Sequence, residues 1–376
     1  MADSAVASGL RVQQWDKEFF REYIHDGRFR ELMGEGESSI IQVKEDLSKK
    51  DGDSVTYALV NRLTNSATTG SAVLEGNEED LTSRSMRVYV DKRRNAVRVP
   101  EMEEQKSAVS LRNAAKPMLM DWILEDTREL YLTALGSLNG TAFTSRTAAI
   151  ADAWLVDNVD RIQFGAVASP SATDLSSALS DLDTTADKFD NVALDAMLLK
   201  AKTCSPKIRP MRDKGNGKRY YVALAGPHAF KNLRDSMDTE VLAVTAVEMQ
   251  ASKLFEGGDL LWNGCIVKEV DNMPIYPNIG NGGTTEVTPV YLLGAQALAH
   301  AICKRTKSIE ETFDYGDKHG VAVEHILGIR KLIFGSGTGD TDDLKDNGVV
   351  TGFFATTGAG TSNGVNASTG TAAELA

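Results

Sequence analysis

The chain has 376 residues, of which 42% are hydrophobic and 25% charged, a composition typical of a globular protein with a sizeable core. It has no apolar run long enough to span a bilayer, and its first residues lack the basic and apolar regions of a secretory signal. The formal net charge of −12 argues against a protein that wraps nucleic acid, because each phosphate contact needs a cation.

The N-terminal part predicts an amphipathic helix over residues 12–33, ending near Gly34. Trp15, Phe19 and Phe20 recur at helical spacing, with charged residues on the opposite side. An aromatic stripe this close to a chain end needs a surface to lie on. That surface is either the chain's own core or a neighbouring subunit.

Residues 40–99 show the alternation of β-strands, as in Val55, Tyr57 and Leu59. The strands flank a polar and acidic stretch at 64–82, and the basic run at 91–95 predicts a hairpin turn. This block has too few apolar residues for a core of its own. A two-stranded ribbon is only marginally stable in water, so we expect it to lie against something else.

Residues 107–138 predict a long helix, which Pro117 is expected to kink or restart. Residues 125–129 are expected on its polar side. The expected apolar stripe consists of Val109, Ala115, Met118, Leu119, Trp122, Ile123, Leu130 and Leu135.

The stretch 150–335 predicts a mixed α/β body. It contains two short helices within 171–200, a strand at 219–225, a helix from Pro227 to Met237, and a hairpin turn at Asn263-Gly264. The last part, 336–376, is rich in small residues, and we expect a flexible tail from about residue 357.

Two motifs that carry chemistry are missing: the sequence has no P-loop and no GxGxxG. Cys204, Cys265 and Cys303 have no metal-ligand spacing, and the pair formed by His300 and Cys303 favours core packing over a metal site. The acidic run from Asp340 to Asp346 fails the calcium-loop pattern and favours a solvated turn. We therefore expect no catalytic residue, cofactor or metal.

Two basic stretches stand out, at 84–98 and 202–219. The first is bracketed by acidic residues at 75–80 and 101–104, which suits docking between copies of the chain; a solvated face and nucleic acid are the alternatives. The candidate inter-subunit contacts are Arg84, Arg87, Lys92, Arg93, Arg94, Arg98, Glu78, Glu79, Asp80, Trp15, Phe19 and Phe20.

The order of parts (arm helix, β-ribbon, long helix, α/β body) resembles the tailed-phage capsid fold named after phage Hong Kong 97. The stretches WDKEFFREY, YYVALAGPHAFKNLRD and FDYGDKHGVAVEHILGIRKLIF are similar to the major capsid protein family of N-four-like phages, and the resemblance runs from about Trp15 to Ala355. It implies an α+β fold divided into an N-arm at 1–36, an extended β-loop at 37–104, a spine helix with its connection at 105–147, a body of axial and peripheral parts at 148–335, and a C-terminal segment at 336–376.

The resemblance also implies a structural subunit that assembles as hexamers and pentamers into an icosahedral shell around double-stranded DNA, formed in the host cytoplasm. The implied partners are further copies of the chain, a portal protein, a decoration protein in some relatives, and DNA in weak contact. The region before Gly34 is too short for a fused scaffold domain, so we expect a separate scaffolding protein. An encapsulin-like shell that stores cargo and a cytoplasmic enzyme are the alternatives.

Overall fold

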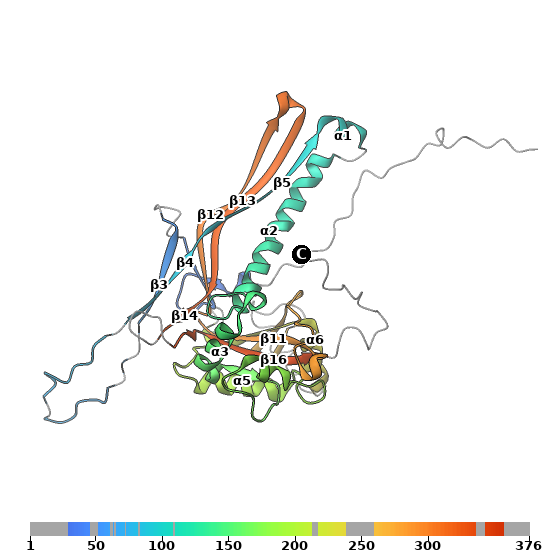
Figure 1. Ribbon diagram of the computed structural model, residues 1–376. Coiled ribbons are helices and arrows are strands. Elements are labelled where there is room, and N and C mark those ends of the chain that lie inside the picture. Colours follow the sequence, from blue (N-terminus) through green and yellow to red (C-terminus); the bar gives the residue numbers. More distant parts are fainter. Residues whose placement is uncertain are drawn as a thin grey trace, which may run out of the picture. The chain divides into compact units, whose positions relative to one another are not determined.

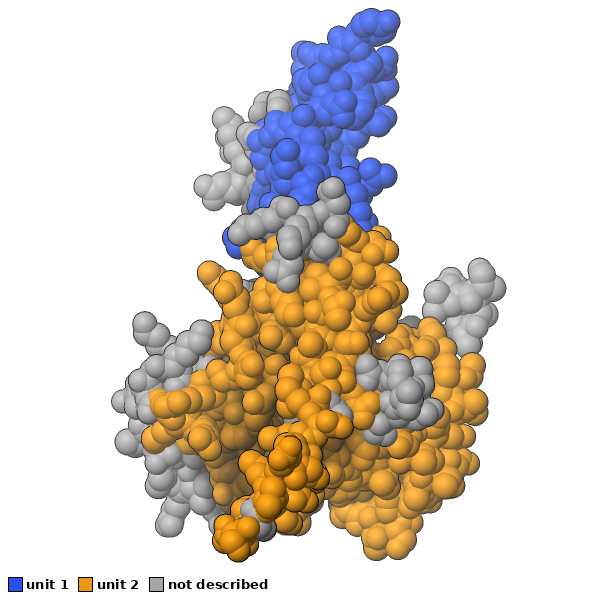
Figure 2. All heavy atoms as spheres, turned by 90° about the vertical axis from the view of Figure 1, so that its left-hand side faces the viewer, with its two compact units in different colours: residues 1–26, 92–127, 304–326 blue, residues 27–91, 128–303, 327–376 orange. Residues whose placement is uncertain are grey.

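The computed structural model describes residues 29–45, 52–60, 63, 65–71, 73–81, 83–107, 110–212, 217–237, 259–335 and 343–356. They form two compact units, coloured separately in Figure 2, and each unit is assembled from separate stretches of chain. Unit 1 takes its described residues from Lys92–Thr127 and Lys304–Ile326, and unit 2 takes the others. No helix in the described ranges has the length and apolarity needed to cross a membrane.

Unit 2 is built around a mixed sheet with strand order β6–β16–β11–β8–β10–β9, to which β7 adds by pairing with β8. The strands are almost wholly buried apolar residues, as expected of a sheet covered on both faces. Their bounds are β6 (Ile162–Phe164), β7 (Met211–Arg212), β8 (Arg219–Ala225), β9 (Leu260–Trp262), β10 (Cys265–Glu269), β11 (Glu286–Leu293) and β16 (Val349–Thr356).

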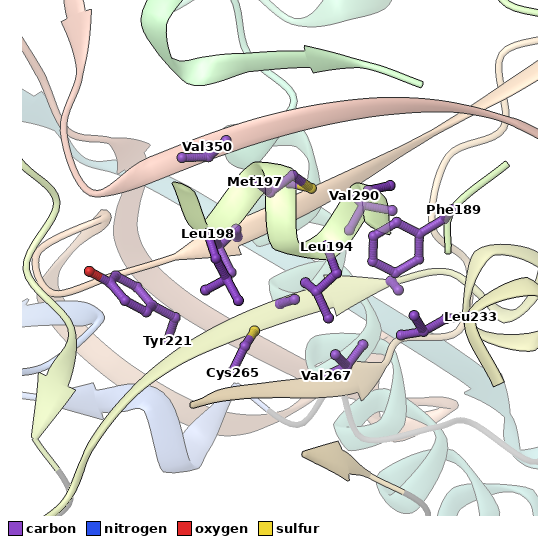
Figure 3. Packing of buried hydrophobic residues seen from close by; sticks show 14 of the residues in the cluster. Phe189, Leu194, Met197, Leu198, Tyr221, Leu233, Cys265, Val267, Val290 and Val350 are labelled. Atoms are coloured by element: carbon purple, nitrogen blue, oxygen red, sulfur yellow. The ribbon is translucent and has the colours of Figure 1, made fainter. Parts of the chain in front are cut away.

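Two helices, α5 (Asn191–Thr203) and α6 (Pro227–Ser236), cover one face of this sheet. Figure 3 shows Leu194 and Leu198 of α5 and Leu233 of α6 packed over the strands. Each helix begins with a sequence signal: the Asp190 carboxylate caps α5 by accepting from Ala193 N at 2.7 Å, and α6 starts at a proline.

The opposite face of the sheet packs against the C-terminal part of α2 (Leu111–Leu135). In β8, alternate residues such as Val222 and Leu224 point to this face, where they meet Tyr131 and Leu135. A smaller core around Trp154 holds α3 (Ala148–Asp157) and α4 (Leu175–Ser180) at the β6–β16 edge.

A buried ion network closes unit 2 near β14 (Ile333–Phe334) and β15 (Lys345–Asp346). The Asp346 carboxylate accepts from Lys331 Nζ at 2.6 Å and from Trp154 Nε1 at 3.0 Å. Arg161 donates to the Asp346 main-chain oxygen and, at 2.8 Å, to that of Pro206. An unpaired charge is costly to bury. These contacts therefore allow the charged groups of Arg161, Lys331 and Asp346 to be buried together.

The β-ribbon consists of β3 (Ser54–Val60) and β4 (Ser83–Tyr89), paired in antiparallel register. One face of the ribbon is buried through Val55, Tyr57 and Val88, which pack against Ala299 of β12 and Leu332 within unit 2. The ribbon therefore lies against the chain's own core, as its lack of apolar residues indicated. Before it, β1 (Met33–Gly34) pairs with β2 (Ile41–Lys44), and β2 pairs with the start of β12 (Leu298–Phe313).

Unit 1 contains the far part of β12, β5 (Asp91–Pro100) from Lys92 on, β13 (Lys318–Lys331) up to Ile326, α1 (Glu101–Lys106) and the N-terminal part of α2 (Figure 1). The strand order is β12–β13–β5. Its small apolar core consists of Leu119 and Ile123 of α2 with Val321 and Val323 of β13.

Charged side chains reinforce unit 1 beside this small core. Arg93 of β5 binds Asp126 of α2 through two hydrogen bonds, at 2.7 and 2.5 Å. His325 of β13 places Nε2 3.6 Å from the same carboxylate. Glu324 pairs with Lys92 at 2.6 Å and with Lys304. We call these six residues the charged clamp.

The structure corrects four sequence-based expectations. Residues 91–95 are not a hairpin turn but the start of β5, because Arg93 has a buried partner and the run can remain extended. Helix α2 runs from Leu111 to Leu135 without a break at Pro117, so it does not restart there. Asp126 and Arg128 are buried rather than on a polar face, and Met118 is 49% exposed rather than part of the apolar stripe.

The fourth correction concerns the N-terminal helix. Most of residues 12–33 lie outside the described residues, but the end of that range is a 3-10 turn at Arg30–Leu32 followed by β1. The parallel pairing of Met33 with Ile41 takes these residues into the sheet, so the helix does not reach Gly34.

Stability of unit 1 is expected to depend on Ile123 more than on its neighbours. Ile123→Ala leaves a cavity against Val321 and Val323 and should lower the free energy of unfolding by about 2–4 kcal/mol. Met118→Ala, on the exposed side of the same helix, should change it by less than about 0.5 kcal/mol. Urea unfolding followed by circular dichroism measures both; equal losses would show that α2 presents a different face.

Acid is expected to weaken unit 1 through His325. Burial lowers the pKa of His325 below its usual 6.5, although the Asp126 charge opposes the shift. The unfolded chain therefore binds this proton more readily, so stability falls as pH drops below about 6.5. Hydrogen bonds from Lys304 and Lys92 hold the pKa of Glu324 at about 2, against an ordinary 4.5. The stability that Glu324 contributes is therefore lost at lower pH, as the pH falls from about 4.5 towards 2.

The measurement is the urea midpoint between pH 7.5 and 5. His325→Gln should flatten the decline, while His228→Gln on α6 should keep the parental slope. An unchanged slope in His325→Gln would show that this histidine has the same pKa in the folded and in the unfolded chain.

Candidate functional site

The residues that suggested chemistry have structural roles. His300 is buried, and its Nδ1 lies 2.7 Å from the Tyr131 hydroxyl. Burial raises the pKa of the Cys204 thiol and, more strongly, that of the Cys265 thiol, so neither is a ready nucleophile at neutral pH. Within the described part of the chain, no group of three or more His, Cys, Asp or Glu residues is arranged to hold a metal ion.

The acidic run does not form a solvated turn throughout. Asp340 and Asp342 lie outside the described residues, and Asp343 is exposed with φ of 49°. Asp346 is buried and bound to Lys331, so it belongs to the core rather than to a surface turn. The sequence analysis missed this, because the partner lies on a different strand.

The basic stretch at 84–98 is divided between the two units. Arg84 and Arg87 lie on β4 in unit 2, and the other four residues lie on β5 in unit 1. Lys92 and Arg93 are engaged in the charged clamp, and the Arg98 guanidinium lies 4.6 Å from the centre of the Phe313 ring. These three cations therefore hold unit 1 together.

Two cations of this stretch face solvent. Arg87 lies on the side of β4 opposite to the buried Val88, and Arg94 projects away from the side of β5 that carries Arg93. Neither forms an ion pair with a described residue. Arg87 and Arg94 are thus the members of the basic stretch that remain available to a partner.

The acidic candidates lie on the loop between β3 and β4. Glu79 accepts from Asn65 N at 2.8 Å and Glu78 accepts from Gly76 N at 2.6 Å, so both carboxylates order the loop, while Asp80 is exposed. Trp15, Phe19 and Phe20 fall outside the described residues.

The same loop carries an apolar surface that the sequence analysis did not single out. Val73, Leu74 and Leu81 are 66, 62 and 69% exposed. Their signal was present as apolar residues within an acidic stretch, but only the structure shows that their side chains are exposed rather than packed in a core. Exposed apolar side chains gathered on one loop indicate a surface that a partner covers.

Comparison with known proteins identifies the class of protein. The family model described as "Phage capsid protein" matches residues 3–352. A curated relative, the major capsid protein of Pseudomonas phage KPP25, is 27% identical over 366 residues, covering 91% of this chain and 94% of its own length.

Solved structures agree. The cyanophage Pam1 capsid asymmetric unit is 28% identical, with a TM-score of 0.81, and the match covers 95% of this chain and 100% of that one. The capsid of Ralstonia phage GP4, at 24% identity, has a TM-score of 0.75 and covers 96% of this chain and 100% of that one. The expected α+β capsid fold is therefore confirmed. Since the family model matches almost the whole length, the chain belongs to the phage capsid protein family.

Proposed function

We propose that the chain is the major capsid protein of a tailed phage, and that its copies assemble as hexamers and pentamers into an icosahedral shell around double-stranded DNA. Membership of the capsid family makes it a structural capsid protein rather than an enzyme. The observation that carries the proposal is the β3–β4 loop, whose exposed Val73, Leu74 and Leu81 stand beside acidic residues. Such a surface suits burial against a further copy of the chain.

The proposal includes assembly in the host cytoplasm with a separate scaffolding protein and a portal protein. A decoration protein on the outer surface belongs to the same proposal. Support comes from membership of the phage capsid protein family, whose model matches residues 3–352. The contact between copies is assigned to the β3–β4 loop and to Arg87 and Arg94.

Assembly itself is the first test. We expect the full-length chain, expressed with the scaffolding protein of its genome, to form closed particles visible by negative-stain electron microscopy and as fast-sedimenting material. A monomer that persists under all conditions of salt and concentration would contradict the proposal. Particles that enclose host proteins instead of DNA would point to a cargo-storing shell.

The contribution of Arg87 and Arg94 is tested by charge removal. Arg87→Gln with Arg94→Gln should lower particle yield severalfold, because an exposed ion pair worth only about 0–1 kcal/mol is repeated in every subunit. Circular dichroism of the unassembled fraction should be unchanged, and raised salt should lower the parental yield too. Arg93 is left intact, because its bonds to Asp126 hold unit 1 together.

The matched control is Arg212→Gln with Arg219→Gln, which removes the same charge from a different exposed surface. It should assemble at the parental yield. Normal particle yield from the Arg87 and Arg94 variant would show that these residues are solvated surface charges and not part of the contact between copies.

A further inference from the structure

The hairpin formed by β7 and β8 brings like charges together. Arg212 of β7 lies directly opposite Arg219 of β8 in the antiparallel register. Residues in such positions have their Cβ atoms about 4.5–5.5 Å apart, and like charges there destabilise the pair. Lys218 precedes Arg219, and all three side chains are exposed. We call these three residues the basic hairpin.

None of the three cations is neutralised by a described residue, since no ion pair joins them to any described carboxylate. A nearby arginine shows the contrast: Arg209 donates to Gln296 at 2.5 Å and lies 3.9 Å from Glu37. The Arg212 guanidinium lies beside Gly217 instead: a Cβ atom added to Gly217 would lie 3.9 Å from Arg212 Nη2. The unfavourable pair therefore persists without a counter-charge among the described residues.

The rest of the fold holds these cations in place. The neighbouring pair of the register, Met211 and Tyr220, is buried in the core of unit 2. Tyr221 donates its hydroxyl to Ile208 O at 3.0 Å, which fixes the chain leading into the hairpin. Strand β8 is also an inner strand of the main sheet. The charges are thus presented by a rigid element, so little ordering is needed when an anion binds.

We propose that the basic hairpin binds the phosphate backbone of the packaged duplex, an inference that rests on the proposed function. Two adjacent cations opposed by a third suit contact with a row of phosphates, and such contacts carry no sequence information. A single strand is disfavoured, because Tyr220 and Tyr221 are both 7% exposed and offer no stacking surface. The net charge of −12 opposes DNA binding by the chain as a whole, so the contact is weak and salt-sensitive.

The test measures binding of a 30-base-pair duplex to the unassembled full-length chain as salt is varied. Each phosphate contact contributes about 0.9 to the slope of log K against log salt. Arg212→Gln with Arg219→Gln should therefore reduce the slope by about 1.8. Arg87→Gln with Arg94→Gln changes the net charge equally and should keep the parental slope.

Several outcomes would overturn the inference. They are an unchanged slope in the hairpin variant, equal losses in both variants, no measurable binding by the parent at low salt, or tighter binding to polyglutamate than to the duplex. A hairpin variant that loses particle yield but keeps its duplex slope would make the hairpin a contact between subunits.

Failure of the proposed function is distinguishable from these outcomes. It would appear as a parent that never assembles, whereas the inference fails when parent and hairpin variant assemble alike and also bind the duplex alike.

Discussion

The structure of unit 2 depends on a sheet that is apolar on both faces. Strands β8, β10, β11 and β16 have almost no polar side to offer to water, so each face has to be covered. Helices α5 and α6 cover one face, and the end of α2 with the segment around Ile40 covers the other. This constraint brings the N-terminal strands, the long helix and the C-terminal strand into one core.

Most of the buried charged side chains are paired with other side chains inside the fold, so they are not available for catalysis or for binding a ligand. Asp346 is held by Lys331 and Trp154, and Lys268 lies 2.8 Å from Glu31 and 3.4 Å from Asp259. In unit 1, Asp126 and Glu324 are occupied by the charged clamp. Exposed cations such as Arg87, Arg94 and the basic hairpin are therefore suited to partners, in keeping with a structural capsid protein.

Local elements with strong backbone signals were predictable. The turn at Asn263-Gly264 has positive φ at both residues, as a two-residue hairpin requires, and β8 and α6 begin at the expected residues. Failures occurred where a distant partner overrides a local pattern. The charged run at 91–95 suggested a turn, but Asp126, 33 residues beyond Arg93, stabilises it as a strand.

The sequence by itself determined the α+β class, the family resemblance, the main strands and helices of the body and the lack of known catalytic motifs. These follow from periodicity, turn residues and composition, which are local properties of the chain. Only the tertiary structure decided which charges are buried and which are available. Arg93 is bonded to Asp126 while its neighbour Arg94 is exposed, because the partner of a charged side chain can lie far away in the sequence. The register of β7 and β8 likewise places Arg212 opposite Arg219.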